Sequence, residues 1–212
     1  MIEKLLPEGP VSLRHYAYDL GPGRYYQPAY RFIAQEIGAG AGALLDVGCG
    51  PGWLAIHAAQ GQPELDCIGI DSSETMIKLA NRNKSRRLNV TFRHMDAREI
   101  VYPKDTFDNV VSIQSMHHWE EPEAILAELH RVLKVGGRLW LYAADPDADL
   151  PEGWIQRKGP WPPDAYVKGM IRRYTLDAAG FQAMVDRVSK LDWDVTVDTH
   201  GFFRRIVAEK QS

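Results

Sequence analysis

Residues 44–52 read Leu44-Leu45-Asp46-Val47-Gly48-Cys49-Gly50-Pro51-Gly52, and this stretch decides the fold. A short apolar run ends in Asp46, glycines follow at three alternate positions, and Trp53 begins a pattern typical of a helix. A buried strand, a tight glycine turn and a helix N-terminus, in this order, bring the backbone of an α/β protein against a nucleotide-like cofactor. A glycine turn without a ligand is the alternative, and the backbone entropy lost at three glycines argues against it.

The spacing of the glycines selects among cofactors. A dinucleotide fingerprint, G-x-G-x-x-G, needs glycine at positions 48, 50 and 53, and position 53 is Trp. The D-x-G-x-G-x-G run resembles motif I of the class I S-adenosylmethionine-dependent methyltransferases, of the small-molecule type found in ubiquinone and menaquinone biosynthesis. The resemblance implies S-adenosyl-L-methionine as cofactor, S-adenosyl-L-homocysteine as product, and a turn that holds the methionine end of the cofactor. The residues implied in this contact are Asp46, Gly48, Cys49, Gly50 and Gly52.

A second acid closes the next expected strand. The apolar run at 67–70 ends in Asp71, and a helical apolar stripe begins at Met76. In the family such an acid accepts hydrogen bonds from the ribose hydroxyls, so the resemblance assigns Asp71 and Ser72 to the cofactor, with Met76 packing on the adenine. Plainer roles stay open, because a carboxylate can also cap the helix that follows it and Met76 can be an ordinary core residue.

Two further strand ends complete the resemblance. After the run at 90–94, Asp96 and Ala97 match the pair that receives the adenine ring, although Met95 replaces the usual glycine. Gln114 and Ser115 end the strand after that and are the expected contacts to the methionine moiety. In order across residues 44–142, these motifs are far more specific than any one alone.

The fold class follows from helices that alternate with short apolar strands. This alternation predicts a three-layer α/β sandwich around a mostly parallel seven-stranded sheet, with an antiparallel C-terminal hairpin, as in the Rossmann-like methyltransferase fold. Strands are expected at 43–47, 66–70, 89–94, 108–114, 137–143, 192–197 and 202–207, and helices at 52–60, 73–83, 122–134 and 175–189. Gly136-Gly137 is expected to end the third of these helices and Thr175 to cap the last.

A single domain, 1–212, fits the length and the 45% hydrophobic content. Within it we expect an N-terminal helical lid (1–40), a cofactor-binding core (41–143), a substrate-side insertion (144–174) and a closing helix and hairpin (175–212).

Two stretches are the candidates for a substrate chamber. Residues 14–30 hold five tyrosines, more than the docking of one helix needs, and can fold over the cofactor as a lid. Residues 145–161 follow the fifth strand, where loops surround the ligand in such sheets. Histidines also follow the fourth strand, but a packing role is as well supported for them as a catalytic one. The candidate substrate contacts are Tyr18, Tyr25, His118, Trp154 and Trp161, and no catalytic residue is assigned.

The composition and net charge limit the classes of molecule that the protein is expected to bind. A net charge of −3 and a pI of about 6.2 give no broad basic field for nucleic acid. The two cysteines, Cys49 and Cys67, do not make a disulfide framework and fit a reducing cytoplasm, and no metal site is expected. No apolar run is long enough to span a membrane and no signal peptide is evident. Nothing in the pattern sets the oligomeric state.

These observations predict an S-adenosylmethionine-dependent methyltransferase that acts on a small-molecule acceptor by in-line methyl transfer. The acceptor atom is not identified, and a general base is needed only for a hydroxyl or a protonated amine. Two alternatives remain, a catalytically silent cofactor-binding module that acts through a protein partner and, less favoured because of Trp53, a nicotinamide-dependent oxidoreductase.

Overall fold

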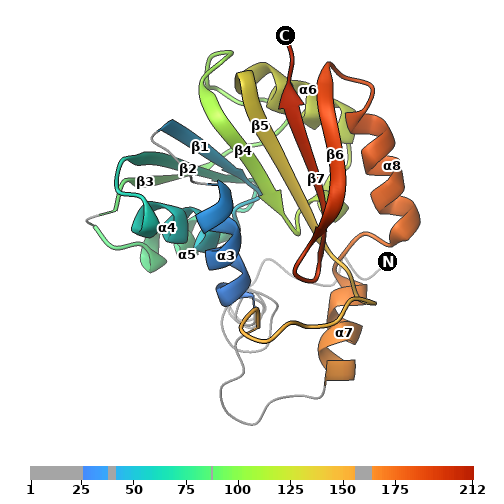
Figure 1. Cartoon of the computed structure of the whole chain (residues 1–212). Helices are drawn as coiled ribbons and strands as arrows, with labels where there is room; N and C mark the ends of the chain where they lie inside the picture. Colours follow the sequence, from blue (N-terminus) through green and yellow to red (C-terminus); the bar gives the residue numbers. More distant parts are fainter. Residues whose placement is uncertain (1–25, 38–41, 87, 156–163) are drawn as a thin grey trace.

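A seven-stranded sheet lies at the centre of the computed structural model, which describes residues 26–37, 42–86, 88–155 and 164–212 (Figure 1). Its strand order is β3-β2-β1-β4-β5-β7-β6, with β7 antiparallel to both of its neighbours and the other pairs parallel. The strands are β1 (Gly42–Val47), β2 (Leu65–Asp71), β3 (Val90–His94), β4 (Phe107–Ile113), β5 (Leu133–Ala144), β6 (Trp193–His200) and β7 (Phe203–Lys210). The predicted fold class is confirmed, including its C-terminal hairpin.

Helices cover both faces of the sheet, because successive side chains of a buried strand point to opposite sides. Leu44 of β1 packs in one apolar cluster and Leu45 in the other. The first cluster takes in α3 (Gln27–Ile37), α4 (Trp53–Gly61), α5 (Glu74–Asn83) and α7 (Asp164–Arg173). The second takes in α6 (Pro122–Val132) and α8 (Ala178–Val188). In Figure 1, α3 and α4 lie on one side of the sheet and α6 and α8 on the other.

The join between α6 and β5 differs from the prediction. Helix α6 ends at Val132, and Leu133 is already extended and paired with Phe107, so Gly136-Gly137 lies within the strand instead of ending the helix. The register shifts between this pair and the next, which marks an irregularity in the ladder. Gly136 has a φ of 74°, and a Cβ on Gly137 would lie 2.9 Å from the carbonyl oxygen of Asp108. The glycine pair therefore serves an irregular strand and not a helix terminus.

The start of α8 also differs from the prediction. Asp177, not Thr175, is the N-cap, and its side chain accepts a hydrogen bond of 2.7 Å from the backbone N–H of Gly180. The hydroxyl of Thr175 instead donates to the carbonyl oxygen of Ala144, at 2.8 Å. Thr175 thus ties the end of α7 to the end of β5. Helix α7 itself lies inside the stretch for which no element was predicted.

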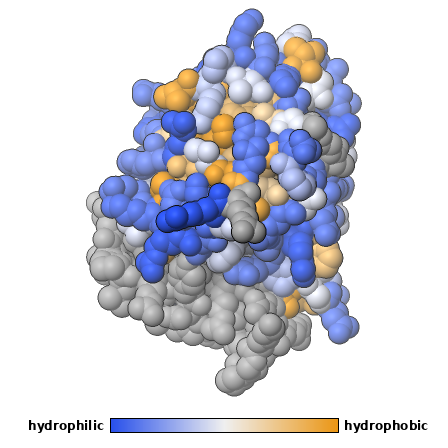
Figure 2. Space-filling model, turned by 90° about the vertical axis from the view of Figure 1, so that its left-hand side faces the viewer, coloured by the Kyte–Doolittle hydropathy of each residue, from blue (hydrophilic) through white to orange (hydrophobic). Residues whose placement is uncertain are grey.

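The surface is largely polar on the face that Figure 2 shows, with apolar side chains gathered mainly near its middle. Among the residues that the structure describes, no helix combines the length and the apolar character that crossing a bilayer requires.

One ring links the glycine turn to the sheet. Phe92 of β3 is paired with Gly69 of β2, and a Cβ on Gly69 would lie 2.6 Å from the Phe92 ring. A Cβ on Gly52, at the end of the turn, would lie 2.4 Å from the same ring. The Phe92 ring therefore fills the space that side chains at both glycines would need.

We expect Gly69→Ala to lower the free energy of unfolding by about 1–3 kcal/mol, because the added methyl overpacks against Phe92. Gly61→Ala is the matched control, since a Cβ there meets no atom within 4 Å and the residue is helical. That change should leave the stability unchanged or raise it by about 0.5 kcal/mol. Urea denaturation of both variants checks this, and equal effects would show that the contact with Phe92 does not limit position 69.

Candidate functional site

The glycine turn after β1 is fastened to the end of β2. The backbone N–H groups of Gly48 and Cys49 donate to the carbonyl oxygen of Ile70, at 2.9 and 3.0 Å. The next N–H, of Gly50, donates to Oδ2 of Asp71 at 2.8 Å. Three consecutive amides thus take their partners from one strand end, which fixes the path of the turn.

The three glycines of the turn are needed for different reasons. All have left-handed backbones, with φ values of 68° at Gly48, 50° at Gly50 and 82° at Gly52, a conformation that favours glycine. A Cβ on Gly48 would lie 2.4 Å from Oγ of Ser115, so packing also excludes a side chain there. A Cβ on Gly50 would meet no atom within 4 Å. The turn therefore presents bare backbone to open space at Gly50, where a ligand can approach closely.

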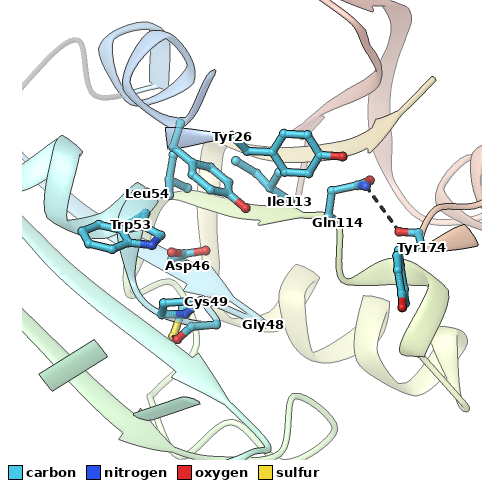
Figure 3. A pocket seen from close by; sticks show the side chains of 12 residues that line it. Tyr26, Asp46, Gly48, Cys49, Trp53, Leu54, Ile113, Gln114 and Tyr174 are labelled. Carbon is cyan, nitrogen blue, oxygen red and sulfur yellow. Dashed lines mark hydrogen bonds between the residues drawn. The ribbon is translucent and has the colours of Figure 1, made fainter. Parts of the chain in front are cut away.

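A pocket adjoins this turn and has one acidic side chain, Asp46, in its wall (Figure 3). It has a free volume of about 60 Å³. The predicted nucleoside contacts Asp71, Met76 and Asp96 are not in its wall. The lining residues are Tyr26, Tyr30, Asp46, Gly48, Cys49, Gly50, Pro51, Trp53, Leu54, Ile113, Gln114 and Tyr174.

Asp46 is the most perturbed acid of the site. Asp46 is only 3% exposed, and its Oδ2 has no hydrogen-bond partner among the described residues. Burial raises the pKa of Asp46 to about 7, with a smaller upward contribution from Asp71 and an opposing one from the backbone of Ala55. A buried carboxylate oxygen without a partner costs free energy unless a ligand provides a hydrogen bond or a positive charge. Asp46 is therefore suited to bind a cationic or hydrogen-donating group.

Asp71 lies at the end of β2, as predicted, and both of its oxygens are used. Oδ1 accepts a bond of 2.8 Å from the N–H of Ser73, and Oδ2 accepts the one from Gly50. Burial raises the pKa of Asp71, and these two bonds oppose the rise. The N-cap of α5 is Ser73, whose hydroxyl accepts a bond from the N–H of Met76, so Asp71 does not itself cap the helix. Ser72 is exposed, and Met76 is buried.

Asp96 lies at the surface beyond β3 and is held by a cation that the sequence reasoning missed. Arg98 binds it with its Nε at 3.1 Å from each oxygen and its Nη2 at 2.6 Å, and also pairs with Glu121. Arg98 keeps the pKa of Asp96 below its usual range. Ala97 is half-buried beside it. The carboxylate is therefore charged and fixed in direction.

Gln114 braces the pocket through both ends of its amide. Oε1 accepts a bond of 2.7 Å from the N–H of Ala144, and Nε2 donates at 3.3 Å to the carbonyl oxygen of Tyr174 (Figure 3). Its φ of 54° is unusual for a residue other than glycine, which fits a position under functional constraint. Ser115 lies behind the turn, where its Oγ meets Oγ of Ser112 at 2.9 Å and accepts a bond of 3.1 Å from Trp119.

Two of the five candidate substrate contacts, His118 and Trp154, lie among the described residues. Tyr18, Tyr25 and Trp161 lie outside the described residues. Trp154 stacks on Phe32, with ring centroids 5.1 Å apart, and lies under the turn of the β6–β7 hairpin. These contacts give Trp154 a packing role.

The two histidines after β4 differ in exposure. His118 is exposed, and its charge lowers the pKa of Asp71 slightly against the larger effect of burial. Burial lowers the pKa of the neighbouring His117 to about 4, so His117 is neutral near pH 7. Neither ring is in the wall of the pocket.

The sequence reasoning missed all four aromatic residues of the pocket wall as site residues, namely Tyr26, Tyr30, Trp53 and Tyr174. Tyr26 and Tyr30 are one helical turn apart, a spacing that could have placed them together once α3 was assigned. Tyr174 follows α7, and no local pattern marks it. Helix α3 is held over the sheet by Glu36, whose Oε1 accepts a bond of 2.5 Å from Nη1 of Arg205.

Comparisons with known proteins agree with this arrangement. A family model described as "Methyltransferase domain" matches residues 45–141. The chain is 32% identical over 172 residues to a malonyl-[acyl-carrier protein] O-methyltransferase of Halalkalibacterium halodurans, covering 80% of this chain and 58% of that protein. It is also 32% identical over 132 residues to a demethylmenaquinone methyltransferase of Symbiobacterium thermophilum, covering 60% and 53%. The aligned part spans about half the length of the curated relatives it matches.

A solved structure shares the fold. A SAM-dependent methyltransferase from Aquifex aeolicus superposes with a TM-score of 0.63 at 21% identity, covering 98% of this chain and 95% of that one. The family match and the curated relatives confirm the resemblance to the class I S-adenosylmethionine-dependent methyltransferases that the glycine turn carries, and the solved structure shows the same fold.

Proposed function

We propose that this protein transfers the methyl group of S-adenosylmethionine to a small-molecule acceptor. The observation that carries the proposal is the bare backbone at Gly50, open to space and flanked by two acids, Asp46 and Asp71, at the carboxyl ends of adjacent parallel strands. Ligands of open α/β sheets bind at this edge. The relatives named above for menaquinone and acyl-carrier substrates support an acceptor other than a nucleic acid.

Each acid has a distinct task in this proposal. Asp46 accepts a hydrogen bond from the ammonium of the cofactor with its free oxygen, Asp71 accepts from the ribose hydroxyls with its remaining lone pairs, and Asp96 accepts from the adenine amino group. All three strands end at one edge of the sheet, so the acids can contact one extended molecule. The bound cofactor supplies a methyl carbon activated by a sulfonium, so the chain needs no covalent nucleophile.

The remaining residues orient the acceptor and exclude water. Tyr30 belongs to α3 and Tyr26 directly precedes that helix, and Tyr174 is fixed on the far side by Gln114. Rigid rings with polar tips can shape an apolar chamber and still bind a polar acceptor. In-line attack then needs only that the acceptor lone pair, the methyl carbon and the sulfur are aligned. A cytoplasmic location is part of the same proposal and rests on two cysteines that are buried and unpaired.

The direct test is calorimetry with S-adenosylhomocysteine, followed by a scan of small-molecule acceptors with detection of S-adenosylhomocysteine as product. Binding together with turnover on any acceptor supports the proposal. Binding without turnover on any acceptor class would favour the silent cofactor-binding module. Absence of binding to both cofactor forms would overturn the proposal.

We expect Asp71→Ala to weaken binding of S-adenosylhomocysteine by about 10- to 100-fold, because a charge-assisted acceptor for the ribose is lost. Stability should fall as well, since the N–H groups of Gly50 and Ser73 lose their partner. Asp177→Ala is the matched control, because that carboxylate also accepts a hydrogen bond from a backbone amide, that of Gly180, but caps α8. It should cost about 1 kcal/mol of stability and leave the affinity unchanged. Equal losses of affinity in the two variants would contradict the assignment of Asp71 to the cofactor site.

We expect the affinity for S-adenosylhomocysteine to depend on pH through Asp46. The pKa of Asp46 is about 7 in the free protein, and an ammonium placed beside it favours the charged form. Binding below pH 7 must therefore release a proton, so the affinity should fall by up to about tenfold per pH unit as the pH drops below 7. Calorimetry between pH 5.5 and 8 measures this.

Asp46→Asn is the control for that titration. It should bind more weakly at pH 8 and lose the pH dependence, although Asp71 and His118 remain in place. A variant that keeps the wild-type slope would assign the titration to another group.

A further inference from the structure

Two buried polar atoms of opposite kind lack partners in the wall of the same pocket. Among the described residues, neither Nε1 of Trp53 nor Oδ2 of Asp46 has a hydrogen-bond partner. The first can only donate a hydrogen bond, and the second, when ionised, can only accept one. Figure 3 shows both side chains at the same end of the pocket, with the nitrogen edge of the indole turned toward the carboxylate.

The position of the Trp53 ring is set by its surroundings. Trp53 is the first residue of α4, directly after the left-handed Gly52, and its ring stacks on His57 with the centroids 6.5 Å apart. The indoles of Trp119 and Trp140 each donate to a side-chain oxygen. A buried N–H without a hydrogen-bond partner costs free energy, and a bound ligand that accepts from Trp53 would remove this cost.

We propose that the indole N–H of Trp53 binds the carboxylate of the cofactor's amino-acid end, beside the ammonium held by Asp46. This inference rests on the proposed function and deepens it, because it names a residue that recognises the carboxylate of the amino-acid end in addition to its ammonium. An α-amino acid carries its ammonium and its carboxylate on one carbon, so it can provide hydrogen-bond partners for Oδ2 of Asp46 and Nε1 of Trp53 at the same time. The first turn of α4 adds amide dipoles that favour an anion at the same place.

The alternative occupant of the indole N–H is Asp46 itself. In that case Trp53 would support the carboxylate that holds the ammonium and would make no contact with the cofactor's carboxylate. The two arrangements predict different losses of affinity when the N–H is removed. Direct binding would affect only ligands that have a carboxylate, whereas support of Asp46 would affect every ligand that has the ammonium.

The test compares S-adenosylhomocysteine with its decarboxylated analogue, which keeps the ammonium and the nucleoside. Calorimetry on the wild type and on Trp53→Phe gives four dissociation constants. We expect Trp53→Phe to weaken binding of S-adenosylhomocysteine by about 10-fold or more and to leave binding of the analogue unchanged, because only the first ligand offers a carboxylate. Unchanged binding of the analogue also shows that the variant is folded.

Trp140→Phe is the matched control, since its indole lies in the same apolar cluster but donates to Oδ1 of Asn109 at 2.9 Å. It should not change the preference between the two ligands. Equal weakening of both ligands by Trp53→Phe would overturn the inference in favour of the bond to Asp46, and no effect on either would overturn it outright. A wild type that binds neither ligand would instead contradict the proposed function.

Discussion

The site depends on three hydrogen bonds that fasten the glycine turn to β2. The N–H groups of Gly48, Cys49 and Gly50 all donate to the last two residues of that strand, Ile70 and Asp71. These bonds fix where α4 begins and leave the backbone at Gly50 facing open space. The shape of the turn and the direction of the Asp71 carboxylate therefore depend on each other. A change at Asp71 must act on both.

The second constraint is the burial of Asp46 against the same turn. An ionised carboxylate at this depth destabilises the free protein, because folding raises its pKa from 3.8 to about 7. By linkage, the stability associated with its protonated form is present below pH 3.8 and is lost as the pH rises through 7. A core chosen for stability alone would place an apolar residue here. The proposed ligand would restore the solvation that Asp46 loses on folding, whereas the half-buried Asp96 already has Arg98 as its partner.

Sequence patterns predicted the elements whose signals are local. Alternation and apolar runs placed every strand, and the hairpin at the sheet edge followed from the period-two pattern before Thr199-His200-Gly201. The errors arose where tertiary contacts override a local signal. Gly136-Gly137 was predicted to end a helix, but pairing of Leu133 with Phe107 extends the strand through it. Thr175 has the chemistry of a cap, yet its hydroxyl bonds to Ala144 and leaves that role to Asp177.

The same distinction holds at the site. The acids at strand ends could be predicted because each ends an apolar run that the parallel sheet brings to one edge. The partners that fix them could not. The contact of Arg98 with Asp96 depends on side-chain conformations that the sequence does not show. Tyr174 reaches the pocket only through the path of α7 and the amide of Gln114. In the sequence, Trp53 marked only the absence of a glycine, because an unpartnered indole N–H is a property of the packed structure.

The placement of Asp46 near Asp71 also bears on the direction of the proposed reaction. Burial raises the pKa values of both acids, and Asp71 raises that of Asp46 further, so a positive charge brought next to them is favourable. The sulfonium of S-adenosylmethionine supplies one such charge, and transfer of the methyl group removes it. Two carboxylates that attract the cofactor before transfer therefore attract the product less, since the charge they faced has been neutralised. The same pair that binds the cofactor would thus favour exchange of product for fresh cofactor without any change in the shape of the pocket.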